Sequence, residues 1–566
     1  MFFVRDRFLQ IKTDCLADYR TGKYVAVNNG SGSRHRKKSM VINAKFWSRF
    51  NLMHYRVIVW TLFGISIICA FGILSIKLEA DYNWDLRNYH FYSPYAVLND
   101  RLNIDHNAAG LQTTINPTLD ILTTYPLLRY TTPTIFCFIL GGFQGVNFLL
   151  LMMISLEFLR KEYFAHKSLC FLFSLLAAVA GVMGALSFSE IGTTFADLTL
   201  SVLNLISIYI VIRINWQQDL KNNKIYLIFC GLMIGLSAGL KLTNIIYLFG
   251  LLITFILVFI RKYLNKSIVV CFSALTGFVI AHGWWSIYLW EEYRNPIFPF
   301  FNSIFKSERY PITSVIDKRF LPIGLIQKIF YPFFFSHGTY TAEPGFIDFR
   351  FPLAYICLIL LLTKLILNLM QGEPQRIRIP KIMVFLWGFT IISYVLWQYE
   401  FSIQRYAITI ELLLPLLIFV TLLQVVPRYA KVIFVVCIIG FFLTTKPPDW
   451  GRSASLENFF YDIRGKFSVT EINSLDNSAI ILGHQPLGWI APALNLKNAI
   501  WLGKPFNERD KAIAIKKLRT RKSVYFITSS RRVDIDDTRS TLFEYGFSMR
   551  ESYACKQLAN LLICRE

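Results

Sequence analysis

Long apolar runs separated by short polar segments dominate the chain. An α-helix of about 20 residues crosses a hydrocarbon core of about 30 Å. On this pattern we predict eleven spans, at residues 57–77, 133–156, 168–188, 196–213, 225–242, 245–260, 267–289, 351–370, 382–399, 407–425 and 432–445. The fifth and sixth runs lie close enough together to form one broken helix instead of two spans.

The polar segments between the runs alternate in charge. With the N-terminus in the cytoplasm, the segments on that side are 160–167, 213–224, 261–266, 372–381 and 427–431, and each is short and net basic. Lysine and arginine accumulate in cytoplasmic loops of membrane proteins. Topology therefore accounts for the net charge of +23, and we do not expect a nucleic-acid partner.

The other side receives longer segments. These are the loops 79–132 and 290–350, the short turns 188–197 and 397–405, and the chain from 446 onward. The sequence predicts a basic, partly disordered cytoplasmic segment at 1–56, in which Met1 and Met40 are alternative starts, and a transmembrane domain at 57–445. We place the protein in a bacterial inner membrane, although an endoplasmic reticulum would give the same topology.

The C-terminal region, 446–566, has the pattern of a small α/β domain. Residues 478–483 and 523–530 are rich in β-formers, 507–522 form an amphipathic helix pattern, and the last residues suit a closing hairpin. Cys555 and Cys564 lie in this tail, where an oxidising compartment would allow a disulfide; two free thiols are the alternative.

Acidic residues gather on the predicted outer side. Asp81 and Asp85 follow the first span directly, Glu190 lies in a very short turn, and Asp197 opens the next apolar run. In "WDLRNYHFYSPYA" the spacing places Asp85 and two tyrosines on one face of a helix along the membrane surface. An interfacial aromatic belt with solvated acids is the alternative for this stretch, and a helix cap is the alternative for Asp197.

Cations on the same side need anionic partners. Lys241 interrupts an apolar run and Arg405 precedes another, while Lys306, Arg309, Lys318 and Arg319 lie in the long loop. The partner is either an acidic side chain of the protein or a phosphate, which arginine binds in a bidentate manner. The segment 336–346 has the composition of a mobile flap, in which His337 is a polar loop residue.

These residue types together suit group transfer from a lipid phosphate. A carboxylate can accept a proton from an acceptor, carboxylates can hold a divalent cation, and a cationic side chain can neutralise a leaving phosphate. The acids and cations thus predict an active site on the outer face of the membrane.

Three short motifs also resemble those of the GT-C glycosyltransferases. "DLRNYHFYSPYA" is similar to their first-loop D-E-x-x-Y motif, with Asp85 at the aspartate, Tyr89 at the tyrosine, and Leu86 in place of the second acid. "TTFADLTLSVLNL" is similar to their D-x-P-L motif, with Asp197 at the aspartate. "QRYAITIELLLPLL" is similar to a late R-Y stretch, with Arg405 and Tyr406 at those positions.

The resemblance implies an α-helical polytopic membrane protein with a GT-C-like fold and a small C-terminal α/β domain. It implies a transferase that moves a sugar from a polyprenyl-phosphate donor in the lipid phase to a glycan, lipid or protein. Asp85 would be the base or would position the acceptor, with Asp81 as a substitute. Tyr89, His90 and Tyr406 would line the pocket.

The remaining roles concern charge. The resemblance implies that Glu190 and Asp197 bind the acceptor or a metal ion. It implies that Mg²⁺ or Mn²⁺ is a candidate cofactor, held by Asp85, Glu190 and Asp197. It also implies that Arg405 and Lys241 hold the phosphate. A secondary transporter, a polysaccharide polymerase or ligase of another fold, and a non-catalytic scaffold are the competing functions.

Overall fold

Helices fill every segment in which the sequence predicts a span. The structure is a computed structural model that describes residues 55, 57–214, 220–313, 315, 317–371, 379–453, 463–549, 553–558 and 561–566. The predicted N-terminal segment and the basic segment 372–378 lie outside the described residues. The helices over predicted spans are Val57–Lys77, α6 (Pro133–Glu162), α7 (Lys167–Val182), α9 (Asp197–Arg213), α10 (Leu220–Leu240), α11 (Ile245–Tyr293), α14 (Arg350–Met370), α15 (Lys381–Glu400), α16 (Ile408–Val425) and α17 (Ala430–Thr444).

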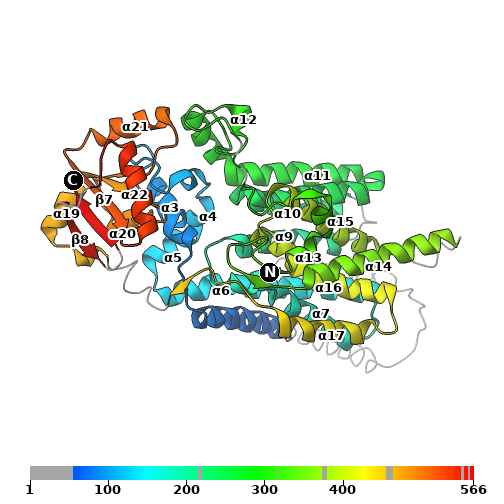
Figure 1. Ribbon diagram of the computed structural model, residues 1–566. Helices are drawn as coiled ribbons and strands as arrows, with labels where there is room; N and C mark the ends of the chain where they lie inside the picture. Colours follow the sequence, from blue (N-terminus) through cyan, green and yellow to red (C-terminus); the bar gives the residue numbers. More distant parts are fainter. Residues whose placement is uncertain are drawn as a thin grey trace, which may run out of the picture. The chain divides into compact units, whose positions relative to one another are not determined.

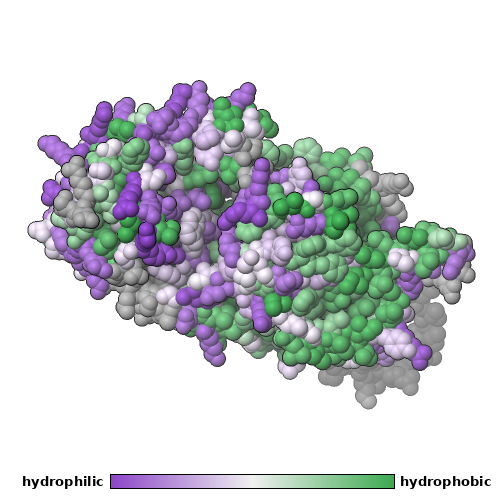
Figure 2. All heavy atoms as spheres, viewed as in Figure 1, coloured by the Kyte–Doolittle hydropathy of each residue, from purple (hydrophilic) through white to green (hydrophobic). Residues whose placement is uncertain are grey.

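Within the described residues, eight helical segments are long and apolar enough to cross a membrane, and α7 and α17 are shorter apolar helices. Apolar side chains cover the exposed face of these helices, whereas polar side chains gather over the C-terminal domain (Figure 2). This distribution suits a helix bundle solvated by lipid. The span count of eleven stays a prediction.

The helical element α11 contains 49 residues, but it is not one straight helix, because the chain reverses its direction within it. A straight helix from Ile245 to Ala281 would be about 54 Å long. Gly239, six residues before Ile245, nevertheless packs against Ala281. Two candidate spans, Leu242–Phe259 and Leu264–Tyr293, therefore lie within α11 and run in opposite directions. The predicted break after the fifth run falls at η3 (Leu242–Asn244).

Glycines allow the close packing of α10 on the second half of α11. Gly231, Gly235 and Gly239 face Val270, Ala274 and Phe278 in turn, always at the same offset, so the two segments run parallel. A Cβ atom at each of these glycines would lie 2.0–2.7 Å from a backbone oxygen of α11. Small residues are the usual means by which membrane helices approach this closely.

The first predicted outer loop folds into a buried layer of short elements. These are η1 (Leu86–His90, a π-helix), α3 (Tyr92–Leu98), η2 (Gly110–Thr114), α4 (Thr118–Leu122) and α5 (Thr124–Tyr130). Tyr89 and Tyr92 are 6% and 1% exposed, so the predicted helix along the membrane surface is instead packed inside the protein. Tyr92 donates to Asp105 and does not share the surroundings of Asp85.

The other short elements connect the spans. They are α8 (Ala185–Ser189), α12 (Asn302–Phe305), α13 (Gly324–Phe334), η5 (Gln404–Ala407), the strand pair β1 (Ala80–Asp81) and β4 (Arg452–Ser453), and the strand pair β2 (His337–Gly338) and β3 (Phe346–Ile347).

The C-terminal region is an α/β domain, as the β-rich runs predict. Its sheet has the order β6-β5-β7-β9-β8, with β5 parallel to β6 and β7, and β9 antiparallel to β7 and β8. The strands are β5 (Ser478–Leu482), β6 (Ile500–Leu502), β7 (Ser523–Ser529), β8 (Ala554–Leu558) and β9 (Leu561–Arg565), and the helical elements are η6 (Arg464–Lys466), α19 (Val469–Asp476), α20 (Ile490–Leu494), α21 (Glu508–Leu518) and α22 (Arg532–Glu544). A disulfide joins Cys555 and Cys564 across β8 and β9.

One face of this sheet packs on the first outer loop (Figure 1). Ile480, Trp501 and Ile527 share a core with Tyr92 and Leu86 of the loop, whereas the alternate strand residues pack against α21 and α22. The main chain of His106 bonds to the main chain of Trp501 and Gly503 on both sides. The C-terminal domain is therefore part of the structure that holds the first outer loop.

We predict that Gly488→Ala weakens this attachment. A Cβ atom at residue 488 would lie 2.0 Å from the carbonyl oxygen of Asn88, within η1. Overpacking of this kind costs about 1–3 kcal/mol. The variant should therefore melt at a lower temperature than the wild type, and limited proteolysis should release the C-terminal domain faster.

The matched control is Gly440→Ala, at a position where a Cβ atom would meet nothing within 4 Å. Equal melting temperatures and equal proteolysis rates for the two variants would contradict the proposed contact.

Candidate functional site

Asp85 and Arg405 form an ion pair between segments far apart in the sequence. Arg405 Nη1 donates to Asp85 Oδ2 at 2.7 Å, and the guanidinium also lies over the ring of Phe195, 4.5 Å from its centroid. Asp85 precedes η1 directly, and Arg405 lies in η5. Burial opposes the ionisation of Asp85, but Arg405, His90 and Lys241 together more than offset it, so the pKa of Asp85 lies below its ordinary value. Asp85 is therefore a carboxylate at neutral pH.

Lys241 and Asp197 form a second pair beside the first. Lys241 Nζ donates to Asp197 Oδ2 and to the carbonyl oxygen of Phe195, at 2.7 Å each. Tyr406 lies between the two cations, with Lys241 5.1 Å and Arg405 5.3 Å from its ring centroid. The structure thus brings together the two acids and two cations for which the sequence predicts roles in one site.

Glu190 completes this group as a buried acid. It follows α8 and is 0% exposed, and among the described residues neither of its carboxylate oxygens accepts a hydrogen bond of good geometry. Burial, and after it the charge of Asp197, raises the pKa of Glu190 well above its usual value. A raised pKa favours the protonated carboxyl group, which can donate a hydrogen bond to a ligand.

Asp81 holds the turn that leads into Asp197. Its Oδ2 accepts from the backbone nitrogen of Thr194 at 2.8 Å and from the Thr194 hydroxyl at 2.7 Å, and Asn83 donates to both of its oxygens. Ala196 has a left-handed conformation, with φ of 73°, which is costly for a residue with a Cβ atom. These contacts give Asp81 a structural part in the site, and its catalytic role stays a prediction.

A buried network that sequence reasoning missed lies behind Glu190. Glu411, on α16, accepts hydrogen bonds from the backbone nitrogens of Leu186 and Ser187 at 3.2 and 2.7 Å. Asp348 accepts from the backbone nitrogen of Ala185 at 2.9 Å and pairs with Arg350 at 2.7 Å. Both acids therefore bond to the first turn of α8, the helix that ends at Glu190. The sequence signal that could have indicated this network is Glu411 itself, a single acidic residue within the apolar run of α16.

Tyr89 and His90 of η1 also lie at this site. Tyr89 is 6% exposed and lies against the His90 ring, with 4.2 Å between ring centroids and an angle of 37° between the ring planes. Burial, followed by the charge of Asp85, raises the pKa of the Tyr89 hydroxyl well above its usual value. His90 pairs with Asp120 of α4, a residue that sequence reasoning missed because nothing in the sequence links positions thirty residues apart. A π-helix is frequent at functional sites, since it reorients side chains locally.

The predicted metal ligands do not form a metal site in this arrangement. In the described part of the chain, no group of three His, Cys, Asp or Glu residues lies close enough to hold a metal ion. Asp85 and Asp197 each face a cation instead, at 2.7 Å. The donors therefore do not fit Mg²⁺ or Mn²⁺, which need several oxygen ligands around one point.

The long-loop cations that the structure pairs have acidic partners within the protein. Arg309 pairs with Glu292 and with Asp510 of the C-terminal domain, and Arg319 pairs with Asp317 and Glu343. Within the predicted flap, β2 and β3 pair in antiparallel fashion, and His337 is exposed.

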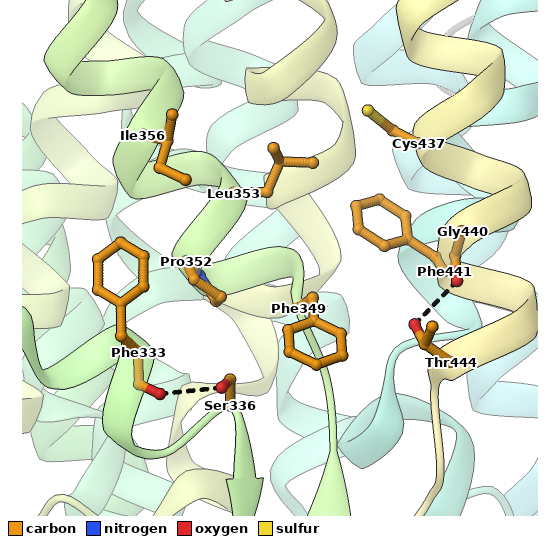
Figure 3. A pocket seen from close by; sticks show the side chains of 10 residues that line it. All are labelled: Phe333, Ser336, Phe349, Pro352, Leu353, Ile356, Cys437, Gly440, Phe441 and Thr444. Atoms are coloured by element: carbon orange, nitrogen blue, oxygen red, sulfur yellow. Dashed lines mark hydrogen bonds between the residues drawn. The ribbon is translucent and has the colours of Figure 1, made fainter.

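An apolar groove of about 430 Å³ lies between α13, α14 and α17 (Figure 3). Phe333, Leu353, Ile356 and Phe441 are among its lining residues. The Ser336 hydroxyl donates to the carbonyl oxygen of Phe333, and the Thr444 hydroxyl donates to that of Gly440. These two hydroxyl hydrogens are therefore already used within the protein. No site residue named above lines this groove.

The fold is similar to that of solved GT-C glycosyltransferases. ArnT from Cupriavidus metallidurans, bound to undecaprenyl phosphate, aligns over 89% of this chain and 98% of its own with a TM-score of 0.56 and 12% identity. The apo form of that protein gives a TM-score of 0.54, also at 12% identity. The archaeal oligosaccharyltransferase AglB from Archaeoglobus fulgidus gives 0.45 at 11% identity, over 82% of this chain and 69% of its own.

ArnT is a lipid A aminoarabinose transferase with the GT-C fold, so the predicted fold class is confirmed. No family model matches the sequence, and no curated protein matches it significantly. At this level of identity the similarity concerns the fold alone.

We predict that Glu190→Gln stabilises the protein increasingly as the pH rises. The pKa of Glu190 is raised in the folded protein from an ordinary value of 4.5. Stability linked to this proton is complete below about pH 4.5 and is lost as the pH rises toward the folded pKa. Glutamine does not titrate, so the melting temperature of the variant should exceed that of the wild type by more at pH 8 than at pH 5.

Thermal unfolding in detergent at several pH values measures this difference. Glu308→Gln is the control, since the side chain of Glu308 is 64% exposed. A difference between Glu190→Gln and wild type that does not change with pH would contradict the proposed protonation.

Proposed function

We propose that the protein is a glycosyltransferase that moves a sugar from a polyprenyl-phosphate donor to an acceptor at the outer face of the membrane. The observation that carries the proposal is the convergence of Asp85–Arg405, Asp197–Lys241 and Glu190 in an ArnT-like fold. Binding of undecaprenyl phosphate to ArnT supports a lipid phosphate as part of the donor.

Arg405 and Lys241 are the proposed phosphate ligands. Their ion pairs with Asp85 and Asp197 keep both cations in place in the absence of a ligand, with 16–17% of each side chain exposed. Positive charge beside the bond that breaks stabilises the leaving lipid phosphate as its negative charge grows. An arginine offers phosphate two parallel hydrogen bonds, and a lysine adds a point charge.

The acids serve the acceptor. Asp85 is ionised and lies 2.7 Å from Arg405, so it either orients an acceptor hydroxyl or amine next to the donor, or takes its proton. Glu190 and Asp197 are the proposed acceptor ligands, with the protonated Glu190 as a hydrogen-bond donor. Tyr89, His90 and Tyr406 line the pocket around them. The acceptor class, whether glycan, lipid or protein, stays open.

The location follows from the same proposal. We place the protein in a bacterial inner membrane with its N-terminus in the cytoplasm and the C-terminal domain outside. The Cys555–Cys564 disulfide supports this side for the domain, because disulfides persist in oxidising compartments. The helices contain four buried cysteines that form no disulfide, as expected of small apolar residues in spans: Cys137, Cys170, Cys230 and Cys357.

Whether a divalent cation contributes to transfer is a separate question with its own test. GT-C enzymes are commonly metal-dependent, whereas the paired carboxylates described above do not fit a metal ion as they stand. Transfer measured in EDTA, with and without added Mg²⁺ or Mn²⁺, tests whether a cation contributes.

We predict that Asp85→Asn lowers the rate of sugar transfer by about 10²-fold or more, the range for the loss of a group that positions the acceptor or takes its proton. The assay uses purified protein with radiolabelled undecaprenyl-phosphate sugars and membrane extract as the acceptor source. Asp100→Asn is the matched control, because Asp100 is an exposed acid of the same outer loop.

Transfer by the wild type and by Asp100→Asn, with loss in Asp85→Asn, is the expected result. Equal transfer by all three proteins would remove Asp85 from the chemistry. No transfer by the wild type, across a broad donor panel and with acceptor present, would overturn the proposed function and favour a transporter or scaffold.

A further inference from the structure

A histidine–aspartate pair lies next to the acids and cations of the proposed site. His90 Nδ1 and Asp120 Oδ2 are 2.7 Å apart, and the other carboxylate oxygen of Asp120 accepts a hydrogen bond from the Thr124 hydroxyl at 2.8 Å. His90 and Asp120 are each 5% exposed. Three elements, η1, α4 and α5, therefore fix the orientation of one imidazole ring.

The Asp120 contact determines which ring nitrogen is free. A carboxylate without a proton accepts hydrogen bonds only, so Nδ1 of His90 is the nitrogen that carries the proton. In the neutral ring, Nε2 then holds a lone pair. Nε2 is buried and has no hydrogen-bond partner among the residues that the structure describes, which is unusual because buried polar atoms are normally satisfied.

The charges around His90 suit a group that gains a proton. Asp120 pairs with the ring, the tilted ring of Tyr89 lies against it, and Asp85 acts on it electrostatically from the start of η1. Asp85 is itself bonded to Arg405, which makes its carboxylate a weaker base. The orienting carboxylate, the fixed tautomer and the free second nitrogen are the features that define a general base held by a third group.

A second buried histidine, His282, lacks one of these features, the orienting carboxylate. His282 is 1% exposed, and its Nε2 also lacks a hydrogen-bond partner within the described part of the chain. Its Nδ1 faces the amide of Asn116 at 3.1 Å instead of a carboxylate. No acid orients or charges this ring in the part of the chain that the structure describes. It lies on α11 and offers a matched comparison within the same protein.

We propose that His90 is the catalytic base of the transfer reaction and that Asp120 is its positioning residue. This inference rests on the proposed function. The acceptor O–H bond breaks and its proton passes to Nε2 of His90, while the acceptor oxygen forms a bond to the anomeric carbon of the sugar. The bond from that carbon to the lipid phosphate breaks, the phosphate leaves with the electron pair, and His90 later returns the proton to water.

Asp85 then has a distinct part. It orients the acceptor and holds Arg405 beside the leaving phosphate, and it does not change its protonation state. Loss of Asp85 and loss of His90 should both lower transfer, but only the His90–Asp120 pair should set the pH dependence of the rate.

The first test needs no substrate. Hydrogen–deuterium exchange at the C2 position of each histidine, followed by mass spectrometry across a pH series, reports the titration midpoint of His90 in the full-length protein. Asp120→Asn should lower that midpoint by about 1 pH unit or more, because a nearby negative charge favours the protonated ring. The midpoint of His282 should not move. An unchanged His90 midpoint would overturn the pairing.

The second test follows transfer from radiolabelled undecaprenyl-phosphate sugars as a function of pH. The rate of the wild type should fall on the acid side, and Asp120→Asn should shift that fall to lower pH by the same amount as the exchange midpoint. His90→Gln should lower kcat by about 10²-fold with little change in the KM for the donor. His282→Gln should transfer normally.

The outcomes separate this inference from the proposed function. Normal transfer by His90→Gln together with loss in Asp85→Asn would overturn the role of His90 and leave the glycosyltransferase proposal standing. An acid limb that does not move in Asp120→Asn would also overturn it. Absence of transfer by the wild type would overturn both. Melting temperatures of the variants, compared with His282→Gln, show whether a loss of transfer arises from unfolding.

Discussion

The pairing of buried charges is the constraint on which the rest of the site depends. Asp85, Asp197, Arg405 and Lys241 lie where little water reaches them, and an unpaired charge there would cost several kcal/mol. Each acid therefore faces a cation at 2.7 Å, and the four groups come from four separate segments of the chain. The pairs are costly to bury and contribute little net stability. Their retention is consistent with a role in binding a charged ligand, because a phosphate can replace a carboxylate as the partner of either cation.

The local backbone around these pairs departs from ideal geometry in ways that place side chains. The π-helix η1 widens one turn between Asp85 and His90, and the left-handed Ala196 turns the chain sharply into Asp197. Neither conformation is favoured by the residues that adopt it. Asp81 holds the turn at Ala196 by accepting two hydrogen bonds from Thr194. The C-terminal domain covers η1, since the backbone nitrogen of Trp489 donates to the carbonyl oxygen of Arg87. The surrounding structure thus fixes strained segments that would not form alone.

The sequence predicts the helices well, because hydropathy depends on solvent and not on partners. Every predicted span contains a helix, and the two β-rich runs of the tail are strands β5 and β7. Burial of the first outer loop was not predictable in this way. Its aromatic residues suit either a membrane interface or a protein core, and only the packing of Trp501 and Ile480 against them decides for the core. Similarly, the charge pattern indicates that Arg405 and Lys241 need anions but does not say that Asp85 and Asp197 are those anions.

The residues that sequence reasoning missed, Asp120 and Glu411, share a physical reason. Each acts through another residue: Asp120 orients the ring of His90, and Glu411 bonds to the backbone of the helix that ends at Glu190. A motif records the residues that meet the substrate, whereas their supports lie wherever the fold brings a chain segment close. Glu411 and Asp120 also differ in whether the group that they bond to keeps an atom free for chemistry. Glu411 and Asp348 both accept from backbone nitrogens of α8, and their further partners are the Ser187 hydroxyl and the Arg350 guanidinium, so they hold α8 in place. Asp120 satisfies one nitrogen of a titratable ring and thereby leaves the other with a lone pair, which is why this support has a chemical consequence as well as a structural one.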